Sequence, residues 1–166
     1  VIEPYRLTRV TSFLRPFDDP YNTGYQLSQA LIAFGRGDWL GVGLGNGIQK
    51  QFYLPEAHTD FLLAVIGEEF GLLGVLTLIG LYMFVVGRGL YISIQAHGTY
   101  SRLLAGSISL TFFVYVFVNT AMVTGLVPVV GVPLPLVSFG GTSMVTLMAG
   151  FGILMSIHSH RKLLPH

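Results

Sequence analysis

The chain has 166 residues, a mean hydropathy of +0.66, and 52% hydrophobic but only 10% charged residues. Soluble domains carry about 25% charged residues, so this composition argues against an ordinary water-soluble globule. A net charge of +1 argues against a nucleic-acid binder, and the absence of cysteine excludes disulfides, thiol catalysis and Cys-ligated zinc. The chain begins at Val1 and shows no signal peptide, so we expect a piece of a longer membrane protein.

Charge divides the chain into two parts. All eight acidic residues lie in residues 1–69, which we interpret as a large extracytoplasmic loop with short amphipathic helices. Residues 70–87 are uncharged and would reach ~27 Å as a helix, close to the thickness of a bilayer's hydrocarbon core. We therefore predict an all-α polytopic membrane protein, in which the large loop is followed by three transmembrane helices at about 70–92, 103–127 and 136–157.

The basic residues predict the orientation of these spans. After residue 70 they are confined to the loop at 88–102 and to the C-terminal tail. The positive-inside rule places both of these segments on the cytoplasmic side. Residues 1–60 and the loop at 128–138 then share the extracytoplasmic face, where we expect the chemistry.

Three segments of the large loop have recognisable patterns. Apolar residues in 25–34 recur at the spacing of a short amphipathic helix. Residues 61–67 are too few to span a membrane, so we expect an interfacial or re-entrant helix before the first span rather than one very long helix. The glycine cluster at 41–47 does not fit a dinucleotide-binding fingerprint. We predict a flexible or sharply turned loop there, with backbone amides free to meet a substrate.

Asp60 precedes the apolar run of 61–67, and two interpretations of it stay open. Asp60 or Thr59 caps the following helix. Alternatively Asp60, partly desolvated at the membrane surface, has a raised pKa and acts as a general base. In the second interpretation, neighbouring charged or polar residues would tune it or bind a charged substrate, namely Lys50, Glu56 and His58.

Three further polar residues stand next to or inside apolar runs. Glu68 and Glu69 would be costly at membrane depth, so at least one should face protein, a cation or a water-filled cavity, unless both only mark the interface. Asn119 lies inside the second span, and we expect it to donate a hydrogen bond between helices.

Several long motifs resemble the SEDS family of bacterial peptidoglycan polymerases. Residues 9–37 and 41–71 are similar to the family's large extracytoplasmic loop. Residues 119–143, NTAMVTGLVPVVGVPLPLVSFGGTS, resemble its signature in the last two helices and the loop between them. PEAHTDF together with AFGRG resembles the division branch of the family. The resemblance implies the C-terminal part of a ten-helix protein in the bacterial inner membrane, at the division septum.

The same resemblance implies a reaction. The intact protein would polymerise lipid II, transferring a growing glycan from undecaprenyl diphosphate to the 4-hydroxyl of an incoming disaccharide. Asp60 matches the family's essential aspartate and would be the base. Positive charge would neutralise the leaving diphosphate. Its sources would be Lys50, Arg15 or Arg36, or a divalent cation (Mg²⁺ or Mn²⁺) held by Glu68 or Glu69. Further substrate contacts are expected from Gln26, Glu56, His58 and Ser138.

The implied partners are lipid II, membrane lipid, a class B penicillin-binding protein of the FtsI type and other division proteins. No nucleic acid is expected. Two rival functions stay open. A lipid II flippase would place its essential polar residues near mid-membrane. A noncatalytic division scaffold would use Asp60 only as a helix cap, a task that asparagine also performs.

Overall fold

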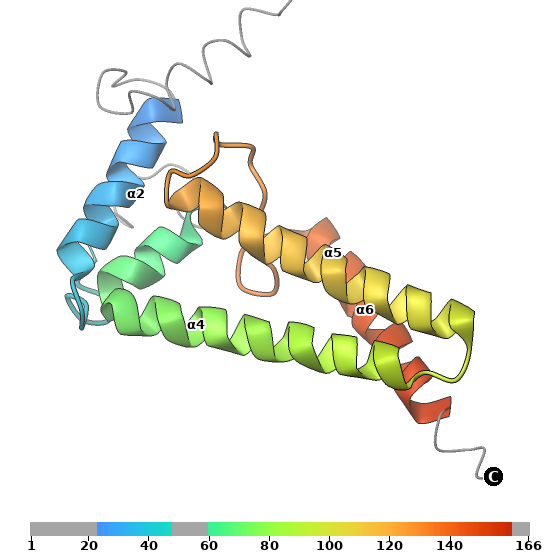
Figure 1. Cartoon of the computed structure of the whole chain (residues 1–166). Coiled ribbons are helices and arrows are strands. Elements are labelled where there is room, and N and C mark those ends of the chain that lie inside the picture. The colour runs from blue at the N-terminus through green and yellow to red at the C-terminus, as the bar shows by residue number, and fades with distance from the viewer. Residues whose placement is uncertain (1–22, 48–59, 161–166) are drawn as a thin grey trace, which may run out of the picture.

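The computed structural model describes residues 23–47 and 60–160, and these residues form helices and connecting loops without strands. The helices are α2 (Thr23–Gly37), α4 (Leu62–Gln95), α5 (Thr99–Val123) and α6 (Gly141–His160). Helix α4 packs against both α2 and α5, and α6 lies beside α5 (Figure 1). Three of the described helices are long and apolar enough to cross a membrane, which confirms the predicted fold class.

Helix α4 begins at Leu62 and ends at Gln95, where the sequence predicts a short helix at 61–67 followed by a span at about 70–92. Its backbone is interrupted at Gly71, where φ is 67° and ψ is −164°. Figure 1 shows the short first segment lying at an angle to the long second one. A short helix does precede the span, as expected for 61–67. The break falls at Gly71 because this backbone conformation is essentially restricted to glycine.

Helix α5 ends earlier than the predicted residue 127. Gly125 has a φ of 74°, and its N–H donates to the carbonyl of Met122 at 3.2 Å. The next N–H, of Leu126, donates to the carbonyl of Ala121 at 2.8 Å. These two bonds form a Schellman motif, which closes a helix when a glycine takes the left-handed conformation just after its end. The helix therefore ends at Val123 although apolar residues continue beyond it.

Helix α6 starts later than the predicted residue 136. Leu136 has a φ of 64°, and the N–H of Ser138 donates to the carbonyl of Leu134 at 3.0 Å in a tight turn. Pro133 and Pro135 in the same segment lack the N–H groups that a helix needs. The helix therefore begins only at Gly141 and continues to His160, past the predicted end at 157.

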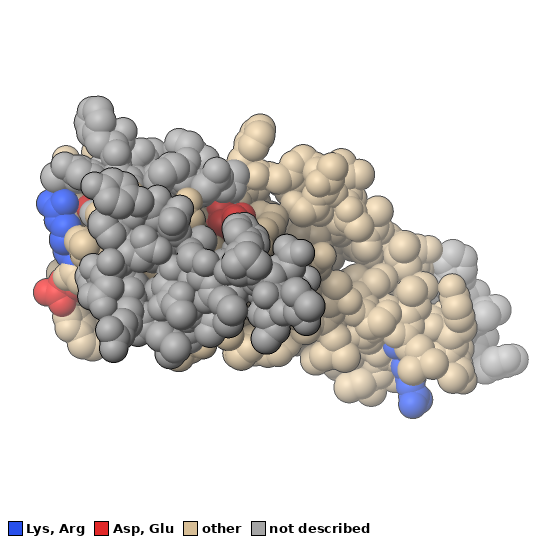
Figure 2. Space-filling view, turned by 90° about the horizontal axis from the view of Figure 1, so that it is seen from above, with Lys and Arg blue, Asp and Glu red and all other residues tan. Residues whose placement is uncertain are grey.

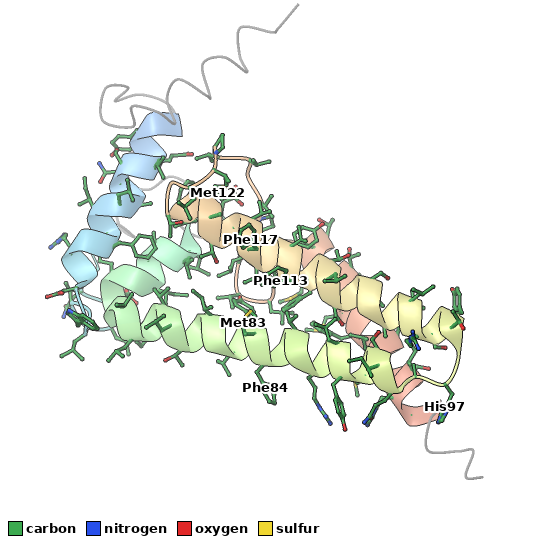
Figure 3. All side chains as sticks on the ribbon, viewed as in Figure 1. Met83, Phe84, His97, Phe113, Phe117 and Met122 are labelled. Atoms are coloured by element: carbon green, nitrogen blue, oxygen red, sulfur yellow. The ribbon has the colours of Figure 1, made fainter. Side chains whose placement is uncertain are left out.

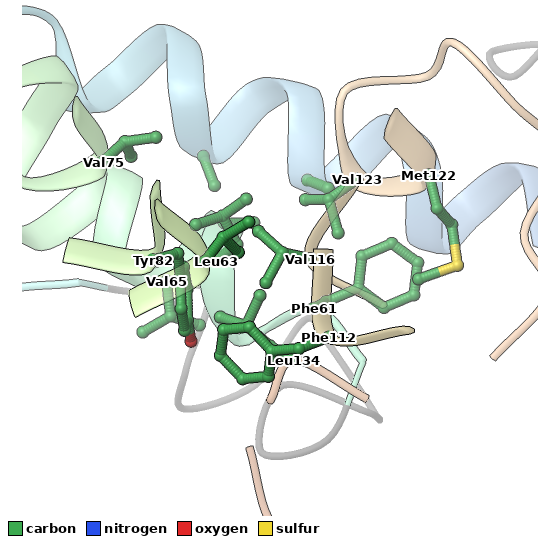
Figure 4. Close-up of a cluster of buried hydrophobic side chains, with 14 residues drawn as sticks. Phe61, Leu63, Val65, Val75, Tyr82, Phe112, Val116, Met122, Val123 and Leu134 are labelled. Atoms are coloured by element: carbon green, nitrogen blue, oxygen red, sulfur yellow. The ribbon is translucent and has the colours of Figure 1, made fainter. Parts of the chain in front are cut away.

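The buried apolar core lies where both segments of α4 meet α2 and α5, and it includes Leu134 of the loop after α5 (Figure 4). The ring of Phe112 on α5 lies edge-on to Tyr82 of α4 and to Phe151 of α6, at 5.8 and 5.4 Å between centroids. The Tyr82 hydroxyl donates to the carbonyl of Pro135 at 2.6 Å, which attaches the α5–α6 loop to α4. In contrast, Phe84 points away from the other described helices and is 71% exposed (Figure 3). Exposed apolar side chains of this kind are typical of a lipid-facing or helix-facing surface.

The loop after α2 is joined to the break in α4 by backbone hydrogen bonds. The N–H groups of Val42 and Gly43 donate to the carbonyls of residues 68 and 69, at 3.0 and 3.1 Å. In return, the N–H groups of Leu72 and Leu73 donate to the carbonyls of residues 38 and 39, at 2.9 and 3.3 Å. A helix break leaves backbone groups without their helical partners, and here the loop supplies new ones. The break and the loop therefore depend on each other.

Replacing Gly71 with alanine should destabilise this joint. The added methyl group would overlap the backbone of Gly41 and Trp39, and the backbone conformation is unfavourable for alanine. We expect the free energy of unfolding to fall by about 1–3 kcal/mol or more. Thermal unfolding of the full-length protein in detergent would measure the change.

The matched control is Gly80→Ala, on the same helix with nothing within 4 Å of the new methyl group. Alanine favours a helix interior over glycine, so this control should leave stability unchanged or raise it by up to about 1 kcal/mol. Equal melting temperatures for Gly71→Ala and the wild type would contradict the role given to the break.

Candidate functional site

The charged residues of the described ranges gather at two ends of the molecule (Figure 2). Arg88 and Arg102 lie by the turn between α4 and α5. The remaining described charged residues lie at the opposite end, near α2 and the start of α4; they are Arg36, Asp38, Asp60, Glu68 and Glu69. The loop at 124–140, which joins α5 to α6, also lies at this end (Figure 1). Residues from three separate parts of the sequence therefore meet there.

Asp60 lies at the junction of these parts. The N-cap position of α4 is Phe61, so Asp60 stands one residue before it, and its side chain is half-buried. A Cβ atom on Gly131 would lie 3.2 Å from Asp60 Oδ2, so the carboxylate lies against the backbone of the α5–α6 loop. Gly131 has a φ of 80°, a conformation that also favours glycine. The segment before α4 and the α5–α6 loop thus meet at the Asp60 carboxylate.

Asn119 forms hydrogen bonds with the same two segments. Its side chain is fully buried, and its Nδ2 donates to the carbonyl of Asp60 at 2.9 Å and to that of Val132 at 2.6 Å. The expected hydrogen bond between helices is therefore not what the described structure shows. Both acceptors belong to non-helical segments, whose carbonyls lack helical N–H partners and so can accept from a side chain.

The glycine cluster forms sharp turns, with positive φ at Gly41, Gly43 and Gly45. Its amides, however, already donate within the protein. Besides the bonds to α4, the N–H of Gly45 donates to Glu69 Oε1 at 3.3 Å, and the N–H of Asn46 donates to the carbonyl of Gly43 at 3.2 Å. The prediction of amides free to meet a substrate was wrong for these positions, because α4 and the loop itself supply their acceptors.

The two glutamates are buried at this joint. Glu68 is 0% exposed, and its Oε1 lies 3.5 Å from Nη1 of Arg36, whose side chain is 43% exposed. Glu69 is 8% exposed and accepts the bond from Gly45. Among the described residues, no group of three or more His, Cys, Asp or Glu side chains could hold a metal ion. The described residues thus do not form such a cluster by themselves, and a cation held by Glu68 or Glu69 stays a prediction.

The other predicted site residues are placed as follows. Gln26 is half-buried on α2. Ser138 is 6% exposed and lies in the turn before α6. Four further predictions lie outside the described residues, namely those for Arg15, Lys50, Glu56 and His58.

A cavity of about 250 Å³ lies between α5 and α6. Pro133 and Pro135 of the connecting loop form one part of its wall, and hydroxyl-bearing side chains such as Thr111, Tyr115 and Ser143 lie among apolar ones. Asp60 is not part of the wall, so the cavity and the Asp60 junction are separate features.

The ion pair between Arg36 and Glu68 should contribute to stability. Removing Arg36 withdraws the positive charge beside a fully buried carboxylate, and the partial exposure of Arg36 limits the cost. We expect Arg36→Gln to lower the free energy of unfolding by roughly 1–2 kcal/mol, and by less in a Glu68→Gln background. Thermal unfolding of the single and double variants would measure the coupling. The control is Arg102→Gln, because Arg102 is an exposed arginine outside this ion pair. Additive effects of Arg36→Gln and Glu68→Gln would argue against the pair.

Comparison with known proteins identifies the family of the chain. The model of the FtsW/RodA/SpoVE family, described as cell cycle proteins, matches residues 1–163. The peptidoglycan glycosyltransferase MrdB of Escherichia coli K12 is 52% identical over 165 residues, which cover 99% of this chain and 45% of that protein. The probable peptidoglycan glycosyltransferase FtsW of Allochromatium vinosum is 50% identical over 160 residues, 95% of this chain and 40% of that one. The chain thus spans less than half the length of these relatives.

Two solved structures share the fold. A chain from a study of how a peptidoglycan synthase complex coordinates polymerization and crosslinking matches with a TM-score of 0.75 and 29% identity. That match covers 96% of this chain and 43% of the other. An aspartate-to-alanine variant of the rod shape determining protein RodA from Thermus thermophilus matches with a TM-score of 0.60 and 33% identity, over 64% of this chain and 36% of that one. By sequence and by fold, the chain belongs to the FtsW/RodA/SpoVE family.

Proposed function

We propose that the whole protein to which this chain corresponds is a peptidoglycan glycosyltransferase that polymerises lipid II, with Asp60 as its general base. The observation that carries the proposal is the junction at Asp60, where a half-buried carboxylate lies against the α5–α6 loop at the charged end of the bundle. The relatives called peptidoglycan glycosyltransferases support the reaction class.

The proposed step is a displacement at the anomeric carbon of the donor sugar. The 4-hydroxyl oxygen of the acceptor disaccharide forms the new glycosidic bond, and the bond to the diphosphate breaks. The diphosphate leaves with the bonding electron pair, and the hydroxyl proton passes to the Asp60 carboxylate. A base is needed because a neutral hydroxyl is a weak nucleophile.

The leaving diphosphate requires positive charge rather than a proton. Arg36 is a candidate because its side chain is 43% exposed while it pairs with Glu68. Arg15 and Lys50 are further candidates. A divalent cation, Mg²⁺ or Mn²⁺, is also proposed, and oxygen ligands would suit either ion. Glu68 and Glu69 would hold it only by giving up the contacts described above.

The reaction is proposed to occur on the extracytoplasmic side of the inner membrane. Arg88 and Arg102 lie at the end of the bundle opposite Asp60, and the positive-inside rule favours the cytoplasm for that end. Lipid II exposed in the outer leaflet could then reach the junction laterally. An extramembranous position for Asp60 favours a polymerase over a flippase, whose essential polar residues would lie deeper.

We further propose a class B penicillin-binding protein as partner and cell division as the process. The similarity to a chain of a peptidoglycan synthase complex supports a crosslinking partner. Relatives called FtsW support the division role, whereas the MrdB relative is similar to nearly the same degree, so identity alone favours neither.

The activity is tested with Asp60→Asn in the full-length protein. Asparagine keeps the shape of the side chain but is a far weaker base, so glycan polymerisation from purified lipid II should fall by at least about 100-fold. The assay contains the penicillin-binding partner, and the amount of glycan polymer resolved on gels over time gives the rate. Membrane insertion and partner binding should equal those of the wild type.

The matched control is Asp38→Asn, an exposed aspartate with a φ of 46° in the loop after α2. Asparagine tolerates positive φ well, so the control should polymerise at the wild-type rate. Full activity of Asp60→Asn would instead leave Asp60 as a structural residue and refute its role as the base.

The division role is tested in the source bacterium by locating the protein in the cell and by depleting it. A fluorescent fusion of the full-length protein should gather at mid-cell, and its depletion should give filaments that keep their rod shape. Rounded cells with an even distribution of the fusion would assign the protein to elongation instead. This outcome would leave the proposed polymerase activity intact.

A further inference from the structure

Asn119 is a buried polar residue that takes no direct part in the proposed reaction. It is fully buried near the C-terminal end of α5. Both hydrogen bonds of its amide nitrogen leave the helix, one to the segment before α4 and one to the α5–α6 loop. A buried amide whose two N–H groups donate to two separate backbone segments fixes the distance between those segments.

The two acceptors lie next to the atoms that matter for the reaction. One is the carbonyl of Asp60 itself, at 2.9 Å. The other is the carbonyl of Val132, at 2.6 Å, and Val132 follows Gly131, the residue against which the Asp60 carboxylate lies. Asn119 therefore binds both the backbone of Asp60 and the part of the α5–α6 loop that the Asp60 carboxylate faces.

We infer that Asn119 is a positioning residue for Asp60, which sets the place of the carboxylate relative to the α5–α6 loop. The inference rests on the proposed function, because it assigns Asn119 a role in the same reaction. Asn119 does not contact substrate in this arrangement, since its side chain is fully buried. It acts only through the two backbone segments that it joins.

Two other contacts hold the α5–α6 loop. The Tyr82 hydroxyl binds the carbonyl of Pro135, and the N–H of Val130 lies 3.3 Å from Met122 Sδ. Both attach the loop to helices. The two hydrogen bonds of Asn119, in contrast, reach both Asp60 and the loop from one side chain. The loss of Asn119 should thus shift the junction without unfolding the loop.

The test replaces Asn119 with leucine, which has a similar volume but no donor, and with aspartate, which keeps the shape but accepts rather than donates when ionised. A catalytic group displaced by about 1 Å can cost ~100-fold in rate. We expect kcat for lipid II polymerisation to fall about 10- to 100-fold in both variants, with KM for lipid II unchanged. Misfolding would also lower the apparent kcat at an unchanged KM, so each rate is divided by the amount of folded enzyme, measured by its cooperative thermal unfolding.

The matched control is Ser109→Ala. Ser109 is also buried on α5, at 3% exposure, but its hydroxyl donates to the carbonyl of Ala105 within the same helix. This variant should keep the wild-type kcat.

A second measurement is independent of activity. Backbone hydrogen exchange in the full-length protein should quicken over residues 124–140 in Asn119→Leu but not in Ser109→Ala. Combining Asn119→Leu with Asp60→Glu, whose longer side chain already displaces the carboxylate, should cost less than the product of the two single effects.

The outcomes separate the two hypotheses. An inactive Asp60→Asn, a reduced kcat in the Asn119 variants and faster exchange over the loop would support the inference. An inactive Asp60→Asn with normal kcat in the Asn119 variants would overturn the positioning role and leave the proposed function standing. A fully active Asp60→Asn would overturn both.

Discussion

The arrangement of the described residues depends on one constraint, namely that every backbone group freed where a membrane-associated helix breaks must find another partner. Helix α4 breaks at Gly71, and the carbonyls and N–H groups on either side would cost several kcal/mol each if left unpaired in an apolar environment. The loop after α2 meets this need with four backbone hydrogen bonds. Because these bonds tie α2 to α4, the position of Arg36 beside Glu68 follows from the same constraint.

The same logic explains why the site lies at one end of the bundle. Polar backbone can be irregular only where protein or water satisfies it. Of the described irregular segments, 38–47, 60–61 and 124–140 are joined at the end that carries Asp60, and only the short turn at 96–98 lies at the other end. At the Asp60 end the segments satisfy one another, partly through the buried amide of Asn119. The remaining helix surface is largely apolar, as expected for helices surrounded by lipid or by further helices. The charged and irregular end is thereby separated from the apolar spans.

Part of the candidate site could be predicted from the sequence because its residues carry direct physical signals. Asp60 stands alone before an apolar run, and the carboxylates of Glu68 and Glu69 interrupt such a run. Gly71, Gly125 and Gly131 were missed as determinants, although each has a positive φ in the structure. An isolated glycine inside an apolar stretch is compatible with a helix, so the sequence pattern cannot distinguish a tolerated glycine from one that breaks the chain. The backbone amides of the glycine cluster were misjudged because their acceptors lie more than twenty residues away, as Gly45 and Glu69 illustrate.

The sequence by itself determined the class of the molecule: an all-helical membrane protein with three apolar helices, and its membership of a family with long, specific motifs. These properties follow from hydropathy and charge along the chain, which local residues define completely. The tertiary structure alone decided where helices break and which segments meet at Asp60. Those features depend on hydrogen bonds between distant segments, such as the 59 positions that separate Asn119 from Asp60. A linear pattern does not encode such pairings, because a buried polar group binds whichever partner the packing of the helices brings within reach.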